Sequence, residues 1–135
     1  MKRALLLGAI AFAVPAGGSS SATAASTPTA QVESIATVTS ENTVIFEFDL
    51  YDCPAGQLVT VDWTARQPDK PDSGAVGGGG YGLSNGDRVL HLVVNAGQSA
   101  FLPGLRWVGS GTVNCGLLSI PVEGSGQTKS GNGGV

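Results

Sequence analysis

The stretch TVIFEFDLYDCPAGQLVTVDWTA, residues 43–65, decides the fold. Within Val44–Leu50, large apolar side chains alternate with mostly polar ones. After a turn at Cys53-Pro54-Ala55-Gly56, the same alternation returns in Leu58–Ala65. A period of two residues is typical of strands that bury one face. The stretch therefore predicts two antiparallel strands that pair with each other as a hairpin.

Shorter runs of the same kind lie on both sides of this stretch. They are Val32–Thr39, Arg88–Asn95, Leu105–Val108, Thr112–Cys115 and Leu117–Val122. About seven short strands separated by turn residues predict an all-β domain over residues 31–122. Two antiparallel sheets packed face to face, as in an immunoglobulin-like β-sandwich, are the architecture we expect from these spacings.

Glycine, proline and serine mark the segments where we expect no regular structure. Residues 67–80 contain two prolines and the run Gly77–Gly80, which indicates a flexible connector. Residues 25–30 are predicted to be a flexible leader. The Gly/Ser-rich residues 123–135 are predicted to be a disordered tail.

The N-terminal residues 1–24 have the three parts of a secretory signal peptide. Lys2 and Arg3 precede the apolar run Ala4–Val14, and Ala22-Thr23-Ala24 is a small-residue cleavage site. The apolar run is too short for a helix that spans a membrane, which needs about 20 residues. The sequence therefore predicts a secreted, extracellular protein without a membrane span.

Charge and cysteine content of the mature chain support this prediction. Removing residues 1–24 from the 135 leaves 111, enough for one domain. Without Lys2 and Arg3, the seven basic residues fall to five against ten acidic ones, a net charge of −5, which argues against a nucleic-acid partner. Cys53 and Cys115 are the two cysteines, and in an oxidising compartment we expect them to form a disulfide. Two free thiols remain the alternative.

Several residues carry resemblances to known families. The order Cys53, Trp63, Cys115 resembles the immunoglobulin domain, in which a core tryptophan packs on a disulfide. The chain also resembles small secreted proteins of unknown function from actinomycete-type bacteria. The carriers of this second resemblance are Cys53-Pro54-Ala55-Gly56, Ala65-Arg66-Gln67, Gly77–Gly80 and Phe101-Leu102-Pro103-Gly104. It implies an exported β-sandwich and no particular activity.

A local resemblance concerns the segment from Phe101 to Cys115. Gly104-Leu105-Arg106-Trp107 and Gly111-Thr112-Val113-Asn114-Cys115 are similar to the late strands of apoproteins that carry enediyne antibiotics, the neocarzinostatin type. Those proteins hold an aromatic ligand in a cleft. The resemblance implies a small-molecule carrier. Because glycines and Arg106 surround Trp107, we expect this side chain to be partly exposed. Trp107, Tyr81 and Arg106 are then the candidate ligand contacts.

Recognisable catalytic chemistry is sparse. His91 is the single histidine, and alternation places it on the solvent side of its strand, away from any nucleophile motif. Acidic residues offer a weak calcium site, from Asp49, Asp52 and Asp62 or from Asp69 and Asp72, but we interpret them as solvated surface groups. We therefore predict no catalytic residues, no metal and no cofactor.

These expectations combine into one functional prediction. The chain is a secreted, non-catalytic binding or structural module whose partner is an extracellular protein, a cell-wall component or a small molecule. An extracellular small-molecule carrier is the alternative, and a secreted hydrolase is a third, weaker reading.

Overall fold

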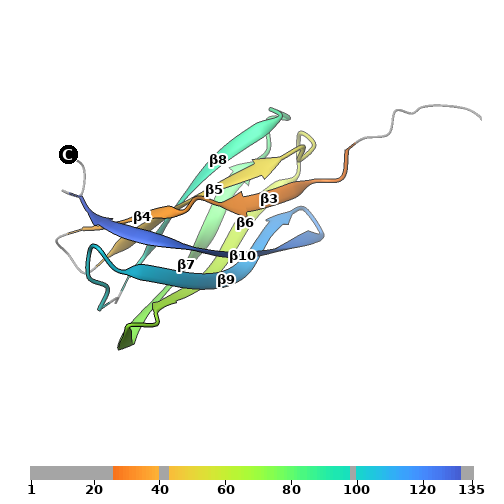
Figure 1. Ribbon diagram of the computed structural model, residues 1–135. Helices are drawn as coiled ribbons and strands as arrows, with labels where there is room; N and C mark the ends of the chain where they lie inside the picture. Colours follow the sequence, from red (N-terminus) through yellow and green to blue (C-terminus); the bar gives the residue numbers. More distant parts are fainter. Residues whose placement is uncertain (1–25, 40–42, 98–99, 132–135) are drawn as a thin grey trace, which may run out of the picture.

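The computed structural model describes residues 26–39, 43–97 and 100–131, and within them the protein is all-β. The signal peptide expected at residues 1–24 lies outside the described residues. Eight strands are described (Figure 1): β3 (Thr29–Val32), β4 (Ile35–Val38), β5 (Val44–Tyr51), β6 (Leu58–Gln67), β7 (Lys70–Leu83), β8 (Val89–Ala96), β9 (Arg106–Cys115) and β10 (Leu118–Ser130).

Strand pairing is antiparallel with one exception among the described strands. β5 pairs with β3 and β4 on one side and with β8 on the other. β6 lies between β7 and β9, and β9 pairs in turn with β10. The exception is β4, whose residues Ile35–Val38 run parallel to Gln127–Ser130 of β10, as Figure 1 shows where the orange and blue strands lie side by side. This parallel pair joins the two groups of strands.

The hairpin predicted from residues 43–65 is wrong, although both of its strands exist. β5 and β6 share no ladder, and their apolar faces meet across the core instead. The ring of Trp63 lies 4.9 Å from that of Phe48 and 5.5 Å from that of Phe46, centroid to centroid. Each strand carries a full apolar face, and facing each other buries both of them at once. The intervening residues 52–57 let the chain cross from one group of strands to the other.

The Gly-rich segment is a strand, which corrects the flexible connector predicted for residues 67–80. β7 pairs with β6 along nearly its whole length, with bulges where the register shifts. The glycines allow close approach: a Cβ on Gly77 would overlap Val94 and crowd Ala96 of β8, and one on Gly78 would overlap the carbonyl oxygen of Val61. Composition alone does not predict such a strand, because glycine is rare in strands except where close packing requires it.

Both predicted flexible ends are shorter than expected. β3 already begins at Thr29, inside the predicted leader 25–30. At the other end β10 continues to Ser130, through most of the predicted disordered tail 123–135. Val122 and Thr128 are buried on β10, and the small residues between them fit tightly against neighbouring backbone, since a Cβ on Gly126 would overlap the Ser34 carbonyl oxygen. Along this part of β10, more buried and more exposed residues alternate, but the side chains are too small for the sequence to indicate which face is buried.

Gln67 is a fully buried polar residue at the end of β6. Its side-chain oxygen accepts a hydrogen bond from Leu102 N at 2.9 Å. Its amide nitrogen donates to Leu102 O at 2.8 Å and to Thr128 Oγ1 at 3.2 Å. One side chain thus fastens the loop before β9 to both β6 and β10.

We expect Gln67→Leu to lower the free energy of unfolding by about 1–3 kcal/mol, because the backbone N–H of Leu102 loses its acceptor while the neighbouring structure stays packed. Urea unfolding followed by tryptophan fluorescence measures the change. The same substitution at the exposed Gln31 is the control and should change stability by less than about 0.5 kcal/mol. Equal effects at the two positions would contradict the role given to Gln67.

Candidate functional site

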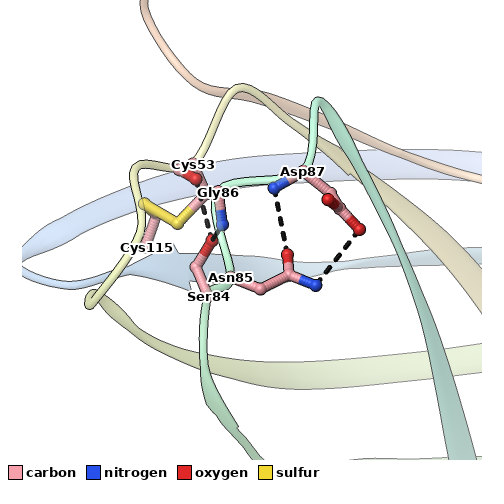
Figure 2. The surroundings of a disulfide bond; sticks show 6 residues. All are labelled: Cys53, Ser84, Asn85, Gly86, Asp87 and Cys115. Carbon is pink, nitrogen blue, oxygen red and sulfur yellow. Dashed lines mark hydrogen bonds between the residues drawn. A yellow bond between two sulfur atoms is a disulfide. The ribbon is translucent and has the colours of Figure 1, made fainter.

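The disulfide organises one end of the molecule. Cys53 and Cys115 are bonded, as expected, and both are buried. Figure 2 shows the loop Ser84–Asp87 held beside this bond: Ser84 Oγ donates to Cys53 O at 2.8 Å and accepts from Gly86 N at 3.1 Å. Asn85 Oδ1 accepts from Asp87 N at 3.0 Å, which closes a turn in this loop. The loop and the two ends that the disulfide joins therefore form one cross-linked unit.

Four exposed leucines gather at this same end. They are Leu58, Leu83, Leu117 and Leu118, here called the leucine end. Leu58 and Leu83 are direct partners across β6 and β7, and Gly116 N donates to Leu58 O at 2.8 Å. Gly116 (φ 62°) and Leu117 form the two-residue connection between β9 and β10, a turn that favours glycine at its first position. Leu117 stands at the tip and is fully exposed.

Trp107 is not a surface contact, and the exposure expected for it is wrong. Its exposed fraction is 0%, and its ring lies 5.1 Å from that of Phe46 and 6.0 Å from that of Trp63. The neighbouring glycines make room for core rings, since a Cβ on Gly109 would overlap Trp63. A depression of about 330 Å³ does lie over β6, β9 and β10, but its lining is formed by Val108, Gly109 and Glu123 among other non-aromatic residues.

Tyr81 and Arg106, the other candidate ligand contacts, lie in separate surroundings. Tyr81 is partly exposed on β7, and its hydroxyl donates to Val93 O of β8 at 2.6 Å. Burial raises the pKa of this phenol, so it stays protonated and keeps its donor role. A groove of about 210 Å³ lies beside it, lined also by Leu90 and His91. Arg106 instead pairs with Asp69, Nε to Oδ2, at 3.2 Å.

The acidic residues do not assemble into either of the weak calcium sites considered from the sequence. Asp49 and Asp62 lie on the outward faces of β5 and β6, whose inward faces meet at the core, so the two side chains point away from each other. Asp69 pairs with Arg106, as described above. Asp72 pairs with Lys70 at 2.9 Å, and the hydrogen bond and charge of Lys70 lower the pKa of this carboxyl.

One group of possible metal ligands does form, from residues that the sequence left apart. Glu33, Asp49 and His91 each offer a ligand atom, and these atoms all lie within 4.8 Å of one another. Asp49 pairs with His91 across β5 and β8, and Glu33 follows β3 on the other side of β5. Asp49, expected to be solvated, is only 7% exposed, because side chains of both neighbouring strands flank it. Sequence reasoning missed Glu33, since its position depends on the register of β3 against β5.

Comparison with known proteins adds no family. No protein-family model matches the sequence, and no curated protein is significantly similar to it. Over residues 26–39, 43–97 and 100–131, no helix is long and apolar enough to cross a membrane. The function of the chain must therefore be inferred from its own residues.

Proposed function

We propose that this chain is an immunoglobulin-like β-sandwich that works outside the cell as a non-catalytic binding module, with the leucine end as its contact surface for another protein. Two groups of strands, β3-β5-β8 and β10-β9-β6-β7, with aromatic side chains meeting between them, support the sandwich. The signal-like residues 1–24 and the disulfide between Cys53 and Cys115 support an oxidising, extracellular location.

The observation that carries the binding role is the full exposure of Leu117 at the tip of a hairpin. Three further exposed leucines lie close by, and together they form an apolar end next to polar, charged loops. Grouped apolar side chains on a soluble domain mark surfaces that contact a partner. The disulfide and the Ser84–Asp87 loop hold this end in place, which lowers the entropy lost on binding.

A carrier role for a small molecule has less support. Trp107 is packed in the core, and the groove beside Tyr81, at about 210 Å³, is smaller than the 300–1,000 Å³ or so typical of ligand pockets. The depression of about 330 Å³ over β6, β9 and β10 reaches this size, but none of the described residues that line it is aromatic. We therefore keep the protein-binding module as the function that the geometry favours.

Photo-crosslinking tests this proposal directly. A benzophenone amino acid at position 117 of the secreted protein should give one discrete adduct with an extracellular protein. Leu58→Ser with Leu83→Ser should lower its yield about tenfold, the effect of losing roughly 1.4 kcal/mol of contact. The same probe at the exposed Ser125, in the middle of β10, is the matched control and should give no discrete adduct. Equal labelling from both positions, or an adduct of twice the chain's own mass, would contradict a separate partner at the leucine end.

A further inference from the structure

The outward face of β3, β5 and β8 carries three ligand types that metal ions use, an imidazole and two carboxylates. Their donor atoms come from His91, Asp49 and Glu33 and lie within 4.8 Å of one another. Donors around one Zn²⁺ ion, at about 2.0–2.2 Å from it, lie roughly 3.4 Å apart. His91 and Glu33 are exposed and free to adjust by the remaining distance, while Asp49 is fixed by its central strand.

An unsatisfied buried oxygen points into this group. Asp49 is more than nine-tenths buried, and its Oδ1 accepts no hydrogen bond within the part of the chain that the structure describes. A buried carboxylate oxygen without a donor or a cation costs substantial free energy. The same oxygen faces His91 Nδ1, so it belongs to this group and needs a positively charged partner there.

The approach of His91 does not by itself satisfy this oxygen. The imidazole Nδ1 lies 2.5 Å from Asp49 Oδ1, but the contact lacks the geometry of a hydrogen bond. Two atoms with lone pairs repel at this distance unless a proton lies between them, and a bound metal ion would hold them about 3.4 Å apart. A proton on His91 would balance the negative charge of Asp49 but not that of the second carboxylate, Glu33.

Charge balance favours a divalent ion. Two carboxylates around a neutral imidazole carry a formal charge of −2, which one M²⁺ ion cancels. Arginine and lysine do not fill this role: Lys70, Arg88 and Arg106 pair with other aspartates, and no lysine or arginine pairs with Glu33 or Asp49 among the described residues.

We propose that Glu33, Asp49 and His91 form a site for a divalent first-row transition-metal ion of the Zn²⁺ type. The imidazole selects against Ca²⁺ and Mg²⁺, which prefer shells of oxygen ligands. Three protein ligands leave a fourth position of a tetrahedral site for water or an outside donor. The His91 side chain is 73% exposed, so this position opens to solvent. The site does not depend on the proposed protein-binding role.

Zn²⁺ titration of the disulfide-bonded chain without a polyhistidine tag tests the site. His91 is the single histidine, so its ring nitrogens give the single set of imidazole signals in a long-range ¹⁵N NMR spectrum. We expect these signals to shift on Zn²⁺ addition, calorimetry to give one site per chain, and Tm to rise by about 4 °C or more at saturating metal. Ca²⁺ at the same concentration should move neither the signals nor Tm.

Single variants separate the site from adventitious binding. Glu33→Gln and His91→Ala change exposed side chains and should each weaken Zn²⁺ binding at least about tenfold, because loss of even an indirect partner of a metal ligand costs that much. Asp49→Asn should do the same, with near-UV circular dichroism to show that the variant is folded. Glu123→Gln, an equal charge change on β10, should leave the affinity unchanged. Unaltered affinity in His91→Ala, a comparable response to Ca²⁺, or no imidazole shift at millimolar Zn²⁺ would overturn the proposal.

Discussion

Replacing Cys53 and Cys115 together by alanine should lower the free energy of unfolding by about 4 kcal/mol. The two residues are 62 positions apart in the sequence, and the bond removes a large loop-closure entropy from the unfolded chain. Natural domains of this size have free energies of unfolding of about 5–15 kcal/mol, so the double substitution would remove a large part of the total stability.

Urea unfolding at 25 °C of the double variant and of the oxidised parent measures this difference. Reduction of the parent with dithiothreitol should give the same stability as the double variant, because both lack the cross-link but keep the rest of the core. The reduced double variant provides the control, since the reductant should not change it. A stability loss below about 1 kcal/mol would show that the joined ends are already held by other contacts such as Ser84 Oγ to Cys53 O.

Trp107→Ala should have an effect of similar size, about 3–5 kcal/mol, through loss of buried contact and creation of a cavity. The ring has an exposed fraction of 0% and sits edge-on to Phe46 and Trp63. Its Nε1 also donates to Ser34 O at 3.3 Å, so it holds the point where the chain passes from β3 to β4. Truncation should therefore loosen the N-terminal strands as well as the core.

Two measurements separate these effects. Thermal unfolding gives the total loss, and amide hydrogen exchange should show faster exchange in Ile35–Val38 than in β6 of the same variant. Trp107→Phe retains an aromatic ring without the indole N–H, and we expect it to recover more than half of the loss. An alanine variant as stable as the parent would mean that the indole is a surface group after all, as the sequence first suggested.

Alternation in the sequence identified which faces of β5 and β6 are buried, and both strands and the disulfide were predicted correctly. It could not identify their neighbours, because a period of two residues reports a face and carries no information about the adjacent strand. The predicted hairpin failed for this reason. The Glu33–Asp49–His91 group was invisible for the same reason, since it exists only through the register of three strands.

Glycine caused two further errors, at Trp107 and in residues 67–80. Glycines beside Trp107 and in Gly77–Gly80 were interpreted as signs of exposure and flexibility. In the structure they are the positions where a ring or a neighbouring strand comes too close for a Cβ, as at Gly109 against Trp63. Without the partner in view, a glycine that permits close packing has the same appearance as one in a loop.

The parallel pair between β4 and β10 has a consequence for the order of folding. Ile35 near the start of the described chain pairs with Gln127 near its end, and β9 reaches β4 only through β10. A growing chain emerges from the ribosome with its N-terminal residues first. One edge of Ile35–Val38 therefore stays without its partner until Gln127–Ser130 have been made, and a polypeptide cut short before residue 127 cannot close this seam.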